Sequence, residues 1–296
     1  MTVIPSSQIA DLSGPIQIVS SIAPFGQGRR AWLVDIWGVM HNGVRPFATA
    51  VAACQTFRRQ GGIVVLLSNS PRTGEGVIAQ LRQVGVPDDA YDGAVTSGDA
   101  TRVLIRQVSD RPIFHLGPER DRPSFKGIDV VFADAETADT IVCTGLFDDR
   151  TETADNYNTL LKGFAARGVE MICANPDITV ERDGKIIFCA GALAERYEAL
   201  GGVARLAGKP HAPIYDMAFE RLADIAGAPV KRADVLAIGD GVKTDIAGAL
   251  AADLDAVYIA SAVGLGLGGA LDPAALNALF PDPTARPIAA MTELAW

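Results

Sequence analysis

The sequence predicts an α/β fold built around a doubly wound sheet of parallel strands. Short runs rich in apolar and β-branched residues alternate along the chain with longer helical patterns. This alternation is typical of right-handed βαβ units, in which consecutive strands run parallel. The chain has 296 residues, enough for two domains at about 150 residues each. Its hydrophobic content of 49% is ordinary for a globular protein and excludes an intrinsically disordered chain.

The expected elements follow from these runs in chain order. Residues 1–29 mix Ser, Pro, Gly and short apolar runs, and we expect them to be an extension packed on the fold. Apolar, β-branched runs predict strands over residues 31–35, 63–68, 94–97, 113–116, 129–132, 140–144, 170–174, 203–207, 235–239 and 256–260. Longer patterns, such as the stripe of Val77, Ile78, Leu81 and Val84, predict helices over residues 46–60, 74–84, 98–108, 153–167, 191–200, 212–225, 244–252 and 272–279.

Charge and cysteine usage limit the partners and the location. The net charge of −9 excludes nucleic-acid binding by general charge, which needs a basic surface. The longest uncharged stretch, 256–271, is Gly-rich and shorter than the roughly 20 residues of a membrane span. No basic residue precedes Arg29, which disfavours a signal peptide. The four cysteines are far apart in the sequence: Cys54, Cys143, Cys173 and Cys189. This spacing favours buried, reduced thiols, which indicate a cytoplasmic protein.

Asp35 stands at the end of the first predicted strand. Ligands of parallel α/β sheets bind beyond the carboxyl ends of the strands, so polar residues at those ends are candidate site residues. A carboxylate directly after Trp32, Leu33 and Val34 is costly to bury unless something binds it. A turn aspartate leading into Gly38 is the alternative, and Asp35 alone does not decide between the two.

The second predicted strand, 63–68, brings Ser68, Asn69 and Ser70 to the start of a helix. Hydroxyl groups and free backbone N–H groups at a helix N-terminus form an anion site, which the helix dipole strengthens. Helix capping by Ser or Asn is the structural alternative, and the two roles do not exclude each other.

Two further segments place charged residues near strand ends. Lys209 precedes Pro210 and a long helix, although a single lysine in a loop is usually solvated. Asp240 ends a strand, and Asp245 follows in the first turn of the next helix. Two carboxylates across such a turn can converge on Mg²⁺. Asp245 could instead complement the helix dipole, but Asp240 has no equally simple structural role, which favours a metal.

Taken in order, these segments resemble the haloacid dehalogenase (HAD) superfamily of phosphoryl-transfer enzymes. The matching motifs are D-x-x-G-V from Asp35, S-N after an apolar strand, G-K-P, and G-D-x-x-x-x-D. The stretches VTSGDAT (95–101), CANPDITVERDG (173–184) and AGALAERYEALGG (190–202) resemble the NagD-type branch, subclass IIA. The resemblance covers about residues 30–264 and implies a doubly wound core with an inserted α/β cap. It implies an extension at 1–29, a core from 30–100 and 201–296, and a cap at 101–200.

The resemblance also implies a mechanism and a set of site residues. Asp35 would be the nucleophile that forms an aspartyl-phosphate, with Lys209 as the second catalytic residue. Mg²⁺ would be held by Asp35, the backbone carbonyl of Trp37, Asp240 and Asp245. Residues expected at the phosphoryl group or substrate are Ser68, Asn69, Ser70, Asn175 and Lys209. The cap would exclude water from a small phosphorylated metabolite, and caps of this type often join subunits into a homodimer.

Trp37 departs from the family pattern. HAD phosphatases have there a second aspartate, which acts as general acid and then as base, whereas indole does not titrate usefully. A positioned acid or base contributes roughly 10²–10⁴-fold, so we expect a slow or specialised phosphatase, better suited to aryl or acyl phosphates. The alternative is a protein that binds a phosphorylated ligand without turnover. His41 is a conceivable substitute acid, although a structural histidine is the favoured interpretation.

Overall fold

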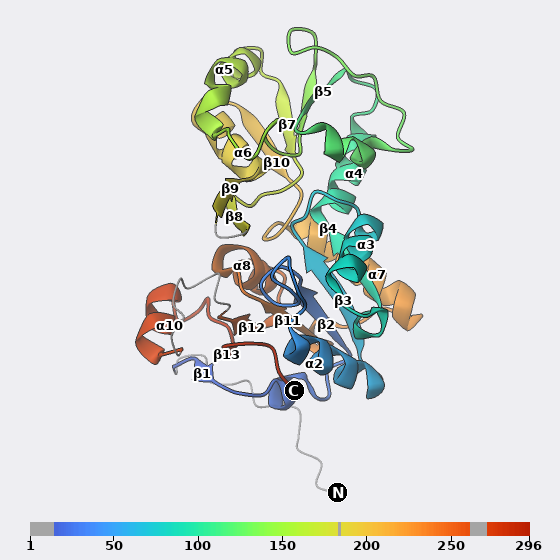
Figure 1. Cartoon of the computed structure of the whole chain (residues 1–296), viewed down its shortest axis with the longest axis vertical. Helices are drawn as coiled ribbons and strands as arrows, with labels where there is room; N and C mark the ends of the chain where they lie inside the picture. The colour runs from blue at the N-terminus through green and yellow to red at the C-terminus, as the bar shows by residue number, and fades with distance from the viewer. Residues whose placement is uncertain (1–14, 183–184, 261–270) are drawn as a thin grey trace, which may run out of the picture.

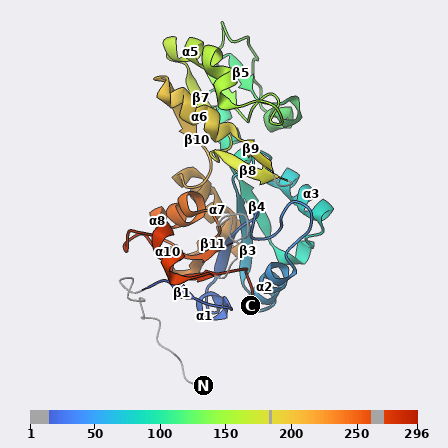
Figure 2. The same cartoon turned by 60° about the vertical axis from the view of Figure 1, so that its left-hand side comes forward.

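The computed structural model describes residues 15–182, 185–260 and 271–296, and within them two parallel sheets form separate parts of the molecule (Figures 1 and 2). The larger sheet has the strand order β1-β13-β12-β11-β2-β3-β4, with every pairing parallel. Its strands are β1 (Gln17–Ile18), β2 (Ala31–Asp35), β3 (Ile63–Ser68), β4 (Gly93–Thr96), β11 (Val235–Gly239), β12 (Asp255–Ile259) and β13 (Ala289–Met291).

Helices cover both faces of the larger sheet, because successive side chains of each strand point to opposite faces. From β2, Trp32 and Val34 pack in one core with α2 (Ala48–Arg59) and α3 (Gly74–Val84). Ala31 and Leu33 pack in a second core, on the other face. The helices there are α7 (Ala212–Ala226), the π-helical turn η5 (Val242–Ile246) and α8 (Ala247–Ala251). The predicted doubly wound core is therefore confirmed.

A second α/β unit is inserted between β4 and α7. Its sheet has the order β10-β7-β6-β5, all parallel: β5 (Ile113–Leu116), β6 (Thr140–Cys143), β7 (Glu170–Cys173) and β10 (Val203–Leu206). Its helices are α4 (Ser97–Gln107), α5 (Asn158–Ala166) and α6 (Ala190–Ala199). The antiparallel hairpin of β8 (Thr179–Arg182) and β9 (Lys185–Phe188) lies between this unit and the core (Figure 1). The inserted α/β cap is confirmed, whereas boundaries at residues 101 and 200 stay predictions.

Some predicted elements are wrong or were missed. Residues 129–132 form no strand, and only Phe132 makes an isolated bridge, to Ile113. Strands β1, β8, β9 and β13 were not predicted. β1 and β13 have only two and three residues, and β8 and β9 include charged residues, so none of them shows a continuous apolar run. Predicted helix 153–167 is divided into the 3₁₀ turn η3 (Ala154–Tyr157) and α5. The remaining elements are α1 (Ala23–Gly26), η1 (Asp88–Ala90), η2 (Glu119–Phe125), η4 (Arg232–Asp234) and α10 (Pro273–Leu279).

All four cysteines are buried, as expected. Burial raises the pKa of Cys54 and of Cys173 to about 12, so these thiols stay protonated at neutral pH. Among the helices of the described residues, none has both the length and the apolar character that a membrane span requires.

Candidate active site

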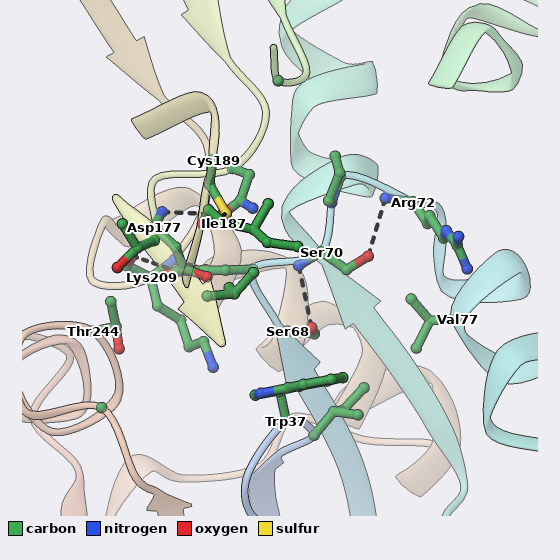
Figure 3. Close-up of a pocket in the computed structure, with 18 of the residues that line it drawn as sticks. Trp37, Ser68, Ser70, Arg72, Val77, Asp177, Ile187, Cys189, Lys209 and Thr244 are labelled. Atoms are coloured by element: carbon green, nitrogen blue, oxygen red, sulfur yellow. Dashed lines mark hydrogen bonds between the residues drawn. The ribbon is translucent and has the colours of Figure 1, made fainter. Parts of the chain in front are cut away.

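The carboxyl ends of three adjacent strands meet at one edge of the core sheet. Because β2 lies between β11 and β3, Asp35, Ser68 and Asp240 come from neighbouring strand ends. Lys209 joins them from the loop before α7, and Figure 3 shows its side chain pointing into the pocket. These residues line a cavity of about 540 Å³, whose other walls come from α3, the cap and the β8–β9 hairpin.

Lys209 is a buried member of the site and not a solvated loop lysine. Its side chain is 3% exposed, and its ammonium donates hydrogen bonds to Asp35, to Asp245 Oδ1 at 2.7 Å and to the Leu67 carbonyl at 3.0 Å. Burial lowers the pKa of Lys209, but the charges of Asp245 and Asp35 outweigh it, so the pKa lies above its ordinary value. Lys209 therefore remains a cation throughout the physiological range.

Asp35 is buried at the carboxyl end of β2 and is therefore not a simple turn aspartate. Burial and the negative charge of Asp245 raise the pKa of Asp35, while the ammonium of Lys209 lowers it. The ion pair with Lys209 supplies the partner that a buried carboxylate needs.

Three carboxylates converge at this edge in the way a divalent cation requires. One oxygen from each of Asp35, Asp240 and Asp245 lies within 4.8 Å of the others. Asp245 also accepts hydrogen bonds from Gly241 N at 3.1 Å and Thr244 Oγ1 at 3.3 Å. Hard carboxylate oxygens suit Mg²⁺, and the three carboxylates exceed the one ammonium by two negative charges. The donor set therefore fits a magnesium ion in charge and in chemistry.

The close packing at Asp245 depends on a glycine. A Cβ on Gly239, the last residue of β11, would lie 2.3 Å from Asp245 Cγ. Only glycine therefore lets this strand end approach the carboxylate so closely.

Asn69 holds the backbone around Lys209. Its Oδ1 accepts a hydrogen bond from Lys209 N at 2.7 Å, and its Nδ2 donates to Lys209 O at 3.1 Å and to Asp177 Oδ1 at 2.8 Å. Both ends of the amide are thus engaged with protein groups. Asn175 lines the cavity, and its Oδ1 accepts a hydrogen bond from Asp177 N at 3.0 Å.

Ser68 and Ser70 lie together on the cavity wall (Figure 3), and Ser68 Oγ accepts a hydrogen bond from Ser70 N at 3.2 Å. The anion site expected at a helix start is not formed by α3, which begins only at Gly74. The N–H of Gly74 donates to the Asp99 carboxylate, and that of Gly76 donates to the hydroxyl of Thr73. The serines can therefore offer hydroxyl groups, but not the dipole of this helix.

Trp37 lines the cavity and is held by the loop that follows it. The rings of Trp37 and His41 meet edge to face, with centroids 5.4 Å apart and an interplanar angle of 85°. Gly43 has φ +86°, and a Cβ there would lie 2.4 Å from Trp37 Cη2. Within the described residues, the buried indole N–H has no hydrogen-bond partner.

His41 fits the structural interpretation. It is buried, its Nδ1 accepts the Gly43 N–H at 2.8 Å, and burial lowers its pKa to about 4. At neutral pH the ring is therefore uncharged.

The β8–β9 hairpin is a part of the site that was not expected from the sequence, whereas Asp177 lies in the stretch 173–184 that carries the family resemblance. The hairpin brings Ile187, Phe188 and Cys189 to the cavity. The pair Asp-Gly at positions 183–184, between two short runs containing Val180 and Ile186–Ile187, is the sequence pattern of a tight hairpin and could have revealed it.

Comparison with known proteins agrees with this geometry. Residues 32–131 match the haloacid dehalogenase-like hydrolase family, and residues 206–274 match a HAD-hydrolase-like family. A crystal structure of a haloacid dehalogenase-like hydrolase from Brucella suis 1330 is 43% identical, covering 93% of this chain and 99% of its own, with a TM-score of 0.83. The chain therefore belongs to the haloacid dehalogenase-like hydrolase family. Its inserted α/β cap is the arrangement expected of the NagD-type branch.

Two more distant relatives bear the names of enzymes. The 5'-nucleotidase YutF of Bacillus subtilis (strain 168) is 25% identical over 238 residues, which are 79% of this chain and 88% of the relative. A glycerol phosphate phosphatase of Mycobacterium tuberculosis, solved in complex with magnesium, is 20% identical with a TM-score of 0.65. That match covers 91% of this chain and 76% of the other, and at this identity it shows a common fold.

Proposed function

We propose that this protein is a Mg²⁺-dependent phosphoric monoester hydrolase that acts on a small phosphorylated metabolite through Asp35. The observation that carries the proposal is the cluster in which Asp35 forms an ion pair with Lys209, and one oxygen from each of Asp35, Asp240 and Asp245 lies within 4.8 Å of the others. The nucleotidase and phosphatase activities of the relatives support the same reaction class.

In the proposed reaction an Asp35 oxygen attacks phosphorus, and the bond from phosphorus to the leaving oxygen breaks. Water then attacks the aspartyl-phosphate, which releases inorganic phosphate and restores the Asp35 carboxylate. Lys209 donates hydrogen bonds to Asp35, Asp245 and the Leu67 carbonyl, and a phosphoryl oxygen would replace one of these three acceptors. The Ser68 and Ser70 hydroxyls line the same cavity. Such fixed donors stabilise the charge that develops during phosphoryl transfer.

Asp35, Asp240, Asp245 and the backbone carbonyl of Trp37 would hold the metal ion. Mg²⁺ in that position supplies positive charge that stabilises the phosphoryl oxygens. Asn69, through its two hydrogen bonds to the Lys209 backbone, acts as a positioning residue in this proposal.

The indole of Trp37 does not act as an acid, so it gives the leaving oxygen no proton. His41 is neutral at pH 7 and its Nδ1 is occupied, so the loop contains no evident substitute acid. Losing such an acid typically costs roughly 10²–10⁴-fold for poor leaving groups and less for leaving groups that depart as stable anions. The proposed enzyme is therefore slow or specialised, with aryl or acyl phosphates favoured over alkyl phosphates.

Trp37 also favours a second candidate, a protein that binds a phosphorylated ligand without turnover. Three further expectations belong to this proposal: a cap bounded by residues 101 and 200, a homodimer, and a cytoplasmic location, the last supported by the buried thiols of Cys54, Cys143 and Cys173.

Turnover of p-nitrophenyl phosphate with Mg²⁺ tests the function. We expect phosphate release that is lost in Asp35→Asn and reduced by EDTA, while the matched surface variant Asp224→Asn on α7 keeps the parent rate. Asp224 is exposed and outside the cavity. If a broad panel of phosphate esters gives no release above background, the binding protein replaces the enzyme.

A further inference from the structure

The cavity has an aromatic wall beside the proposed phosphoryl position. Trp37 comes two residues after Asp35, and its indole ring lines the same cavity as Lys209 and Ser68. In Figure 3 the indole of Trp37 lies edge-on below Ser68, whereas Ile187 and Cys189 lie above the level of Ser70. A ligand held by its phosphoryl group at Asp35 would therefore place the attached group between an indole ring and apolar side chains.

The ring is fixed in place before any ligand arrives. His41 packs edge-on against it, and the missing side chain of Gly43 leaves the space that the ring occupies. A preorganised aromatic surface binds a flat partner at low cost in side-chain entropy. Offset stacking between two rings contributes beyond simple burial of area.

Further apolar side chains narrow the choice of ligand. The hairpin residues Ile187 and Phe188, Leu146 of the cap and Val77 of α3 line the same cavity. A ring clamped between such surfaces buries both faces, which a flexible polyol cannot do without losing water from its hydroxyl groups.

We propose that Trp37 is a stacking platform that selects phosphate esters whose leaving group is a flat aromatic ring. This inference rests on the proposed function for the position of the phosphoryl group. In the reaction the Asp35 oxygen–phosphorus bond forms and the phosphorus–aryl oxygen bond breaks, with the electron pair leaving on the aryl oxygen. A phenol, with a pKa of about 10 like the tyrosine side chain, departs as its anion and needs no proton from the enzyme. Trp37, which stands where the resemblance implies a general acid, thus selects a leaving group that does not need one.

Equilibrium binding separates stacking from leaving-group acidity. Phenylphosphonate and cyclohexylphosphonate have the same number of carbon atoms and a carbon–phosphorus bond that this reaction does not cleave, but only the first ring is flat. Dissociation constants would be measured with Mg²⁺ by isothermal titration calorimetry for the parent, Trp37→Phe and Trp37→Leu. We expect the parent and Trp37→Phe to prefer the phenyl ligand by roughly three- to tenfold, and Trp37→Leu to show no preference. The control Trp296→Phe changes a tryptophan that lies outside the cavity and should match the parent.

Equal affinity of the parent for the two phosphonates, or a preference that persists in Trp37→Leu, overturns the inference. Failure of both phosphonates to bind overturns the inference and the proposed phosphoryl site together. A phenyl preference without turnover of any phosphate ester supports the platform and removes the hydrolase. Turnover of phosphate esters without any phenyl preference keeps the hydrolase and removes the platform.

Discussion

Trp37 stands at the position where the sequence resemblance implies an aspartate. An aspartate there would be small, polar and able to exchange a proton, whereas the indole fills the loop and packs against His41. Gly43 accommodates the ring at a left-handed φ of +86°, so the loop is built for a large residue. The loop around Trp37 therefore has a local structure that matches its large side chain.

Replacing the indole by a carboxyl group tests whether only the acid is missing. We expect Trp37→Asp to raise the turnover of an alkyl phosphate such as glycerol phosphate, by up to roughly 10²–10⁴-fold. Trp37→Asn removes the ring equally but cannot act as an acid, so it should stay as slow as the parent. Steady-state kinetics with Mg²⁺, on variants whose circular dichroism matches the parent, would measure this. A folded Trp37→Asp that is no faster than Trp37→Asn contradicts the missing-acid explanation.

Among the helices, α3 and α4 are connected through their first turns. Thr96 caps α4, and the Asp99 carboxylate bonds back to Thr96 N, which completes a capping box. The same carboxylate accepts the N–H of Gly74, the first residue of α3. One aspartate thus satisfies donors of both helices, which explains why α3 offers no anion site near Ser68.

Asp99→Ala removes this shared acceptor and leaves backbone donors without a partner. We expect the free energy of unfolding to fall by about 1–2 kcal/mol, because capping and buried hydrogen bonds are each worth about this much. Urea unfolding followed by circular dichroism would measure the loss. Asp224→Ala, on the exposed face of α7, should change stability by less than about 0.5 kcal/mol. Equal losses in the two variants would show that the connection between α3 and α4 contributes little.

The assembled chain places an excess of negative charge at one edge of its core sheet. Asp35, Asp240 and Asp245 come from distant segments, and Lys209 compensates only part of their charge. Repulsion among buried carboxylates contributes to the raised pKa of Asp35, which opposes folding with all of them ionised. A cation that binds only the folded site relieves this cost.

Mg²⁺ should therefore stabilise the folded protein. At a concentration 100-fold above its dissociation constant, the ion adds about 2.7 kcal/mol to the free energy of unfolding. Thermal unfolding would show a higher Tm with MgCl₂ that EDTA reverses, and Asp240→Asn should reduce the increase. NaCl at matched ionic strength is the control. If NaCl raises the Tm as much as MgCl₂ does, the effect is general screening and not a metal site.

Local sequence patterns predicted much of the core. Strands β2, β3 and β11 and helix α3 have the predicted bounds. Continuous apolar runs in the strands and apolar residues at helical spacing in α3 indicate directly which residues are buried. The ends of those strands also identified Asp35, Ser68 and Asp240 as candidates, since parallel strands share one functional edge. The motif order added the family and the cap.

Other features depend on contacts between segments that no local pattern connects. The two-residue strand β1 exists because β13 pairs with it, and residues 129–132 lack a continuous partner strand and make a single bridge. Lys209 is buried because two aspartates from elsewhere in the chain neutralise it, and Asn69 is oriented by the backbone of Lys209. The neutral state of His41 likewise follows from burial beneath its neighbours. Burial and pairing are properties of the assembled chain, so only its three-dimensional packing could assign them.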